Sequence, residues 1–536
     1  MPPQLLHLPD GQTFTVTPVF AGLGFKSHEM NMHPNAFPVG WNVVLQTEEE
    51  VESRLDDDDG DDDDDNDNDD EDEDEEPPSP LSPSRKKTRV HPFSRPTLQN
   101  DALFISSISN PSNSDFKPAA SPTRQIAMML WVTLYWYFHQ PEPDRKLRTA
   151  ASKDTPDSAK PVGEWKINIK REGVLRGRNL IPKLERMGLI TAEDPSCGTG
   201  LDDAGAEWAR MFVSRRMFWQ IPGHLFLFTL QPNHNKMNSS VPGSPVVSRP
   251  SSPVRGGEGS RTPYLSMDGF ARLDSDLPGG PTPTSVPHAP VVPIGPFYST
   301  SHLPTYFPPL TLQYTATDGV RHPVRSKPPR MGEIFYSRFI PSVNQYLSFR
   351  VASTSTHPVP YLGPVGGRAP EHTHLAQLTD AQLLQTWMSK PRVSEFWGEY
   401  KPGFLEGVLR QRHSFPAIAL WNGIPFGYVE IYWVKEDILG RHLANGAGEF
   451  DRGLHVFVGE EWARGRVPVW LTSLVQWCFL NDNRTMSVCL EPRVDNKRML
   501  RHLDEAGFGK ERQISFPHKQ AWLVRLWREA WEGPAF

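Results

Sequence analysis

A run of 21 residues, Asp56 to Glu76, is the feature that most limits how this chain can fold. Every position is Asp or Glu except Gly60, Asn66 and Asn68, which gives 18 negative charges. These charges repel one another and the run offers no apolar side chain to bury, so we expect it to stay disordered. Removing 18 negative charges from the net charge of −8 leaves +10, so the rest of the 536-residue chain is mildly basic.

Two low-complexity segments divide the chain into folded parts. Residues 49–122 combine the acidic run with Ser and Pro, and residues 233–292 are rich in Pro, Ser and Gly. We expect both to be dispensable insertions, because long surface insertions add little closure entropy. This division predicts an N-terminal accessory domain (1–48 with 123–232) and a C-terminal domain (293–536).

The cysteines assign no metal site and no disulfide framework. Cys197, Cys478 and Cys489 are the only three, and none forms a CxxC pair. Cys478 lies in an apolar helical pattern and Cys489 in a buried strand pattern, so we expect both thiols to be inert.

The targeting signals favour a cytoplasmic protein that binds neither membrane nor nucleic acid. The N-terminus lacks the pattern of a secretory signal, and the last residues, "GPAF", are no peroxisomal address. The longest apolar run, Ile126 to Phe138, is too short to span a bilayer. Two alternatives stay open: peroxisomal import, and nuclear import through the basic cluster Arg85–Arg89.

Periodicity and turn signals predict an α/β (α+β) chain with a mixed sheet flanked by helices. The Asn422-Gly423 dipeptide between two apolar runs is a strong hairpin signal. In the N-terminal half we expect a helix over 126–138, a strand pair in 164–175, a helix ending at Gly188, and strands on both sides of Pro222-Gly223. In the C-terminal half we expect a helix capped by Thr379 or Asp380, a strand over 453–459, a buried helix over 469–480, a strand over 485–492, a helix over 496–508 and a strand over 520–526. This order gives one strand–helix–strand crossover at the centre of the sheet.

Four blocks carry a resemblance to a known family: "GYVEIYWVKEDILG", "DRGLHVFVGEEWARG", "CLEPRVDNKRM" and "FPHKQAWLV". Their order resembles the GNAT acyl-coenzyme A (CoA) N-acyltransferases, and within them the siderophore-biosynthesis enzymes that acylate N-hydroxylysine or N-hydroxyornithine. The resemblance covers about residues 378–530. The N-terminal half, with "LYWYFHQP", resembles the fungal members, and one interpretation makes it a second, catalytically silent acyltransferase-like unit.

The resemblance implies acyl-CoA as co-substrate, with no permanently bound cofactor. Family members hold the CoA pyrophosphate at a helix N-terminus, where unpaired N–H groups and the helix dipole favour anions. The candidate loop is "ARGRVPVW", and its alternative role is merely to cap the helix. The residues assigned to CoA are Val458, Gly459, Arg464, Gly465, Arg466, Asn496 and Arg498.

The resemblance also assigns the chemistry and the acceptor site. It makes His455 the catalytic base or proton relay, although a lone strand histidine is often a core residue. Asp495 follows the strand that ends at Pro492, where open α/β sheets bind ligands, so we expect it to orient His455 or to be the base itself; its alternative role is the N-cap of the following helix. The residues assigned to the acceptor are Glu430, Tyr432, Lys435, Asp437, Arg493, His518 and Lys519.

The function that this reading predicts is acyl transfer to the hydroxylamino nitrogen of N5-hydroxy-L-ornithine, which makes a hydroxamate. The lack of a peroxisomal address favours an acetyl donor over anhydromevalonyl-CoA, whereas an acyl pocket at Trp433, Phe457 and Trp470 would hold either acyl group. Two other classes stay open: a small-amine or protein N-acetyltransferase, and a non-catalytic nuclear or scaffold protein with a degenerate domain. A homodimer is also an open expectation.

Overall fold

The computed structural model describes residues 2–20, 22–27, 39–52, 86–109, 116–117, 122–177, 180–193, 211–228, 231–232, 313–443 and 446–536. The acidic run 56–76, the segment 233–292 and Cys197 lie outside the described residues.

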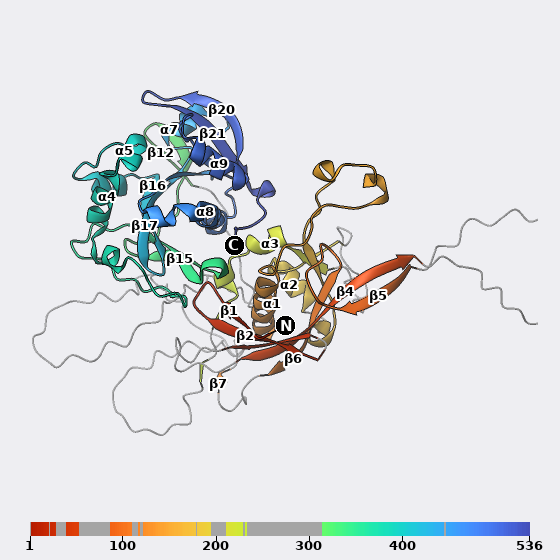
Figure 1. Ribbon diagram of the computed structural model, residues 1–536. Coiled ribbons are helices and arrows are strands. Elements are labelled where there is room, and N and C mark those ends of the chain that lie inside the picture. Colours follow the sequence, from red (N-terminus) through yellow and green to blue (C-terminus); the bar gives the residue numbers. More distant parts are fainter. Residues whose placement is uncertain are drawn as a thin grey trace, which may run out of the picture. The chain divides into compact units, whose positions relative to one another are not determined.

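The N-terminal half builds a nine-stranded sheet with the order β1-β2-β3-β4-β6-β8-β10-β9, and β5 pairs with β4 (Figure 1). Neighbouring strands are antiparallel except β6 and β8, which are parallel and are joined through helix α1. The elements are β1 (Gln4–His7), β2 (Thr13–Val19), β3 (Gly22–Ser27), β4 (Gly40–Glu52), β5 (Lys86–Pro92), β6 (Asp101–Ser109), α1 (Pro122–Tyr137), β8 (Lys166–Ile169), α2 (Ile181–Arg186), β9 (Thr191–Ala192), β10 (Met211–Ser214) and α3 (Arg215–Trp219). The two-residue strands β7 (Phe116–Lys117) and β11 (Gln231–Pro232) pair with each other.

The C-terminal half builds an eight-stranded sheet with the order β14-β15-β16-β17-β18-β19-β21-β20. Here β18 and β19 are the parallel pair, joined through helix α8. The strands are β14 (Ile334–Ile340), β15 (Gln345–Val351), β16 (Ser414–Trp421), β17 (Ile424–Trp433), β18 (Arg452–Val458), β19 (Ser487–Leu490), β20 (Gly509–Ser515) and β21 (Gln520–Trp527). The helices are α4 (Asp380–Met388), α5 (Pro391–Trp397), α6 (Phe404–Leu409), α7 (Ile438–His442), α8 (Val467–Asn481) and α9 (Lys497–Glu505), and a separate hairpin joins β12 (Tyr314–Thr317) to β13 (Val320–Pro323).

Local signals account for the central hairpin of this sheet. Asn422 and Gly423 both adopt positive φ angles, of 45° and 82°, as a tight two-residue hairpin turn requires. Asn422 also accepts hydrogen bonds from the backbone N–H groups of Tyr346 and Gly366, so the turn is tied to the neighbouring strand. Every residue of β17 is buried, which places this strand at the centre of the domain.

The two sheets share one strand order. Each has five antiparallel strands, then a crossover helix, a parallel sixth strand, a second helix and two final strands that enter the sheet in reversed order. A buried aspartate lies at the same register in both. Asp101 accepts a bond from the backbone N–H of Thr97, and Asp451 accepts bonds from those of Gly448 and Ser487.

The mixed sheet flanked by helices confirms the predicted fold class, and the crossover β18–α8–β19 lies where it was expected. Three expectations were wrong. Residues 86–109 are not part of an insertion, because β5 and β6 belong to the sheet. Residues 164–175 hold one strand followed by a 3₁₀ turn, Gly173–Arg176. Residues 215–228 hold helix α3 and a 3₁₀ turn rather than strands, because apolar alternation over a short run also fits one buried helical face.

We therefore expect the deletable part of the N-terminal insertion to be residues 53–85. Glu52 and Lys86 are cross-strand partners in the hairpin of β4 and β5, whose two strands run out together from the sheet in Figure 1. We expect an Asn-Gly turn in place of 53–85 to change the melting temperature by less than about 3 °C, since closing a shorter loop costs no added entropy. Thermal unfolding followed by circular dichroism measures this. Leu103→Asp, at the buried centre of β6, is the destabilising control; an equal loss of soluble protein for both variants would refute the boundary.

Candidate active site

The parallel strands β18 and β19 part after two residue pairs. Arg452 pairs with Val488 and Gly453 with Cys489, and β18 then runs on to Val458 with only β17 beside it among the described residues. A cleft of about 160 Å³ lies at this opening. Its lining comes from α5, the end of β18, the start of α8 and the start of α9: Arg392, Val393, Phe396, Trp397, Val456, Phe457, Val458, Arg464, Val467, Asn496, Arg498, Met499 and His502.

His455 lies beside this cleft between two carboxylates. Register places it directly opposite Glu430 of β17, and its Nδ1 lies 3.1 Å from Glu430 Oε2. Its Nε2 lies 2.6 Å from Oε1 of Glu491, which follows β19. The His455 side chain is 30% exposed, whereas the two carboxylates are 12% and 5% exposed. Solvent and ligands can therefore reach the ring but scarcely the carboxylates.

Glu491 collects further donors. Its Oε2 accepts the Tyr432 hydroxyl at 2.8 Å, and Lys519 Nζ lies 3.5 Å from Oε1 and donates to the Glu491 carbonyl at 3.0 Å. Tyr432 can reach across because its cross-strand partner is Gly453. A Cβ at Gly453 would lie 2.1 Å from the Tyr432 ring, so glycine is required there. On the other side, Tyr428 donates to Glu430 at 2.9 Å.

This arrangement keeps His455 charged. Burial alone would lower the pKa of His455, but the Glu491 carboxylate and hydrogen bonds to both glutamates raise it well above its ordinary value of 6.5. Burial alone would raise the pKa of Glu491, whereas His455, Lys519 and Tyr432 lower it to about 2. At neutral pH the ring is an imidazolium with one N–H on each carboxylate. The histidine is therefore a proton donor in the resting site, and it can act as a base only together with a carboxylate.

The mouth of the cleft is basic. Arg392, Arg464 and Arg498 line it, and they come from α5, the loop before α8 and the first turn of α9. Helix α8 begins at Val467 with no side-chain hydrogen bond at its N-cap, so its first N–H groups lack that partner. Arginine side chains and a helix N-terminus are groups that bind phosphate.

The residues assigned to CoA fall into two groups. Val458, Arg464, Asn496 and Arg498 line the cleft. Arg466 is not among the lining residues; it donates to Gln345 at 2.7 Å and stacks over Trp421, so its contact with CoA stays a prediction. Gly459 packs under Trp387, where a Cβ would lie 2.2 Å from the ring, and Gly465 has open space around its Cα. Contacts of these two glycines with CoA stay predictions.

Asp495 does not orient His455. It is exposed and forms two hydrogen bonds with Arg493, of 2.8 and 2.6 Å, so the expected orienting role was wrong. Glu430 and Glu491 hold the ring instead. Nor is Asp495 the helix cap: Asn496 accepts the Met499 N–H at 3.1 Å and caps α9.

Several residues that were assigned to the acceptor site or the acyl pocket contact other side chains or backbone groups instead. Lys435 pairs with Glu449, and Asp437 caps α7 by accepting the Leu439 N–H at 2.8 Å. Trp433 lies between Arg325 and Arg452, and Trp470 packs near Phe426, so of the three expected acyl-pocket residues only Phe457 lines the cleft. His518 is exposed beside Phe516. Glu430, Tyr432 and Lys519 do join the His455 cluster.

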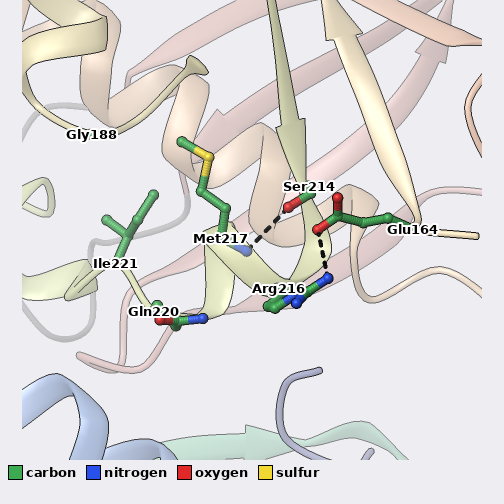
Figure 2. A pocket seen from close by; sticks show the side chains of 7 residues that line it. All are labelled: Glu164, Gly188, Ser214, Arg216, Met217, Gln220 and Ile221. Atoms are coloured by element: carbon green, nitrogen blue, oxygen red, sulfur yellow. Dashed lines mark hydrogen bonds and ion pairs between the residues drawn. The ribbon is translucent and has the colours of Figure 1, made fainter. Parts of the chain in front are cut away.

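A second hollow, of about 430 Å³, belongs to the N-terminal sheet (Figure 2). Its charged groups already have partners, because Arg216 lies 3.4 Å from Glu164 and donates to the Glu529 carbonyl at 2.5 Å. Ser214 accepts the Met217 N–H and caps α3. The charged side chains that line this hollow are therefore engaged with each other or with the backbone, and we assign no reaction to them.

The two cysteines of the C-terminal half are both buried. Burial raises the pKa of the Cys478 and Cys489 thiols to about 12, so neither is a nucleophile at neutral pH. Within the described ranges no group of three or more His, Cys, Asp or Glu side chains is arranged to hold a metal ion. No helix among those ranges is long and apolar enough to cross a membrane.

Comparison with known proteins fits this geometry. The model of the acetyltransferase (GNAT) domain matches residues 376–516, which contain β16 to α9 and so the whole His455 cluster except Lys519. The chain is 59% identical over 532 residues to N5-hydroxyornithine acetylase sidL of Beauveria bassiana, which covers 97% of this chain and 100% of that protein. This chain belongs to the GNAT acyltransferases of siderophore biosynthesis. It is accordingly an acyl-CoA-dependent N-acyltransferase, and the non-catalytic alternative is set aside.

The alignments with more distant relatives span only part of each protein. The N(6)-hydroxylysine O-acetyltransferase of Escherichia coli is 37% identical over 206 residues, which are 37% of this chain and 57% of that protein. The N(5)-hydroxyornithine:cis-anhydromevalonyl coenzyme A-N(5)-transacylase SIDF of B. bassiana is 32% identical over 273 residues, which are 46% and 53% of the two chains.

Sequence reasoning missed Glu491 and helix α5 as parts of the site. Glu491 had one available signal: it is a carboxylate directly after a buried strand, where ligands of open α/β sheets bind. Arg392, Phe396 and Trp397 had none, because the short helix α5 precedes β16 in the chain and reaches the cleft only through tertiary packing.

Glu491→Gln should make His455 titrate at lower pH. The carboxylate stabilises the imidazolium, so replacing it by a neutral amide lowers the pKa of His455 by about 1 to 3 units. NMR titration of the His455 ring measures the shift directly. In the pH profile of kcat/KM, the loss of activity on deprotonating His455 should move to lower pH by the same amount. Glu511→Gln, which removes a carboxylate paired with Arg525 on β20 and β21, is the matched control. An unchanged His455 titration in Glu491→Gln would contradict the charge cluster.

Proposed function

We propose that this enzyme transfers an acetyl group from acetyl-CoA to the hydroxylamino nitrogen of N5-hydroxy-L-ornithine. The observation that carries the proposal is full-length similarity, at 59% identity, to a protein named N5-hydroxyornithine acetylase. The basic cleft at the parting of β18 and β19, with a charged histidine beside it, is the matching local feature.

The reaction forms one C–N bond and breaks one C–S bond, while the nitrogen loses a proton and the sulfur gains one. A hydroxylamino nitrogen is less basic than an alkyl amine, so it is largely neutral near pH 7 and needs no prior deprotonation. The His455 imidazolium supplies the proton for the departing thiolate. The ring, now neutral, takes up the proton that the nitrogen loses, and the two glutamates stabilise its return to the charged state. Proximity in the cleft supplies the remaining acceleration.

The phosphates of CoA are placed by the basic mouth in this proposal. Arg464 and Arg498 form charge-assisted contacts, and the N-terminus of α8 offers N–H groups. The acyl group then points along β18 toward Phe457 and His455. Because Trp433 and Trp470 take no part in the cleft lining, the donor is selected by α5 and Phe457.

Acceptor and donor are tested in one assay. Purified enzyme is given hydroxyornithine or ornithine, with acetyl-CoA and anhydromevalonyl-CoA in competition, and products are separated by mass spectrometry. We expect the acetyl hydroxamate, with little product from ornithine, whose amine is protonated at neutral pH. His455→Ala should lower kcat by about 10²- to 10⁴-fold. A higher kcat/KM for the larger donor would overturn the acetyl assignment, and faster turnover of ornithine would overturn the acceptor.

The N-terminal sheet is, we further propose, a second acyltransferase-like unit without catalysis. When the two sheets are aligned at their parallel pairs, Ile105 takes the position of His455, and Val43 that of Glu430. The opening between β6 and β8 is also filled. Gly173, in the turn Gly173–Arg176, lies so close to β6 that a Cβ would be 2.2 Å from the Ile105 carbonyl oxygen, and Leu175 of that turn is fully buried.

One CoA molecule per chain follows from this proposal. Isothermal titration should give a stoichiometry near one, and the double variant Arg464→Glu/Arg498→Glu should weaken binding at least about tenfold by reversing charge at the phosphates. The control Arg176→Glu, in the turn that fills the N-terminal opening, should leave CoA binding unchanged. Two sites per chain, or tight residual binding in the double variant, would show a working second cleft.

The oligomeric state, the cellular location and the range of partners stay predictions. From the sequence we expect a homodimer, a cytoplasmic location and no nucleic-acid or membrane partner. Analytical ultracentrifugation and fluorescent tagging address them.

A further inference from the structure

Helix α5 forms one wall of the active-site cleft, and it packs over the catalytic histidine. Trp397, in its last turn, meets the His455 ring edge to face at 6.2 Å and also contacts Tyr428 and Phe457. Phe396 and Val393 line the same cleft. The position of this seven-residue helix therefore fixes the space above His455 that the acceptor must enter.

The first turn of α5 is tied to β18. Arg392 donates to the Val458 carbonyl at 2.7 Å and pairs with Glu461 at 3.2 Å, and Lys390, just before the helix, donates to the Gly459 carbonyl at 2.9 Å. These bonds hold one end of α5 at the mouth where CoA enters.

The last turn of α5 is tied to the other side of the cleft by Arg493. The Arg493 Nη1 donates to the Glu395 carbonyl at 2.8 Å, one of the last helix carbonyls, which lack partners within the helix. Its guanidinium lies 4.5 Å from the centre of the Phe396 ring. Backbone pairing of Arg493 with Ala521, and of Val494 N–H with the Gln520 carbonyl, holds the Arg493 segment against β21.

Asp495 completes this arrangement. Its two carboxylate oxygens accept from Nε and Nη2 of Arg493, which leaves Nη1 directed at α5. The guanidinium is planar, so its contacts with Asp495 on one edge and with the Glu395 carbonyl on the other fix its orientation. The carboxylate is exposed and engaged with Arg493, whereas the two ring nitrogens of His455 face Glu430 and Glu491.

We propose that Arg493 and Asp495 act as a latch that holds the C-terminal end of α5 over His455 and so shapes the acceptor site. Asp495 is then a positioning residue and takes no proton. The role in acceptor binding rests on the proposed function, whereas the hold on α5 does not.

The test compares Arg493→Gln, Asp495→Ala and Asp495→Asn with the double variant Arg493→Gln/Asp495→Ala. The matched control is Arg484→Gln, because Arg484 and Asp482 form the same two-bond pair at the same spacing outside the cleft. For each variant we would measure hydrogen exchange of residues 391–398, KM for hydroxyornithine, kcat, and the pH profile of kcat.

We expect faster exchange in 391–398 for Arg493→Gln and Asp495→Ala, with none for Arg484→Gln. KM for the acceptor should rise about 3- to 10-fold in each single variant, as losing a partly exposed charged contact predicts, and no further in the double variant. The value of kcat and its pH profile should stay within about twofold of wild type, and Asp495→Asn, which keeps one acceptor oxygen, should be the mildest variant.

Two results would overturn the latch. A loss of kcat beyond about 100-fold in Asp495→Asn, with Arg493→Gln near normal, would make Asp495 a proton-transfer group. Unchanged exchange in 391–398 for all variants would show that α5 is held without this pair. Exchange does not depend on the acceptor, so a failure of hydroxyornithine as substrate would be distinguished from a failure of the latch.

Discussion

The contact on which the site depends is the imidazole of His455 between two nearly buried carboxylates. Two like charges so close to one another would be costly if nothing lay between them, and the charged ring offsets that cost. The backbone supplies the geometry: the register of β17 and β18 sets Glu430 opposite His455, and the parallel contact of β18 with β19 brings Glu491 to the other nitrogen. Gly453 then leaves room for Tyr432 to hold Glu491 in place. The positions of the three charged groups are therefore set by strand register more than by the conformation of any loop.

A site of this kind combines two demands that usually conflict. The parting of β18 and β19 must stay open to admit a long ligand, yet the groups beside it must stay dry enough to remain strongly coupled. The structure separates the demands in space. The glutamates lie in the closed part of the sheet, the arginines lie at the open mouth, and the histidine ring beside the cleft is the most exposed of the three charged groups. Helix α5, tied by arginines at both ends, limits how wide the opening becomes.

Much of the C-terminal sheet could be predicted from the sequence, and the reasons are local. Asn422-Gly423 marks its hairpin, Thr379 with Gln382 caps α4, and the crossover β18–α8–β19 carries alternating and all-round apolar patterns. His455 could be singled out by resemblance. Its contacts with Glu430, Glu491 and Trp397 could not be predicted, because elements far apart in the chain bring these residues together only in the folded domain. Asp495 illustrates the error: its spacing after a strand suggested chemistry, but Arg493, two residues earlier, was the nearer partner.

The filled opening in the N-terminal sheet has a historical consequence. At the register position that Gly173 occupies there, the C-terminal sheet has Arg493, whose side chain turns outward to α5. If both sheets descend from one ancestral unit, the N-terminal copy could not regain activity by restoring a histidine and two glutamates, because a backbone turn now occupies the space for the ligand. Loss of catalysis in that copy is then hard to reverse. A copy released from catalysis tolerates extra chain, which is consistent with the extended hairpin of β4 and β5 being the place where the acidic run was inserted.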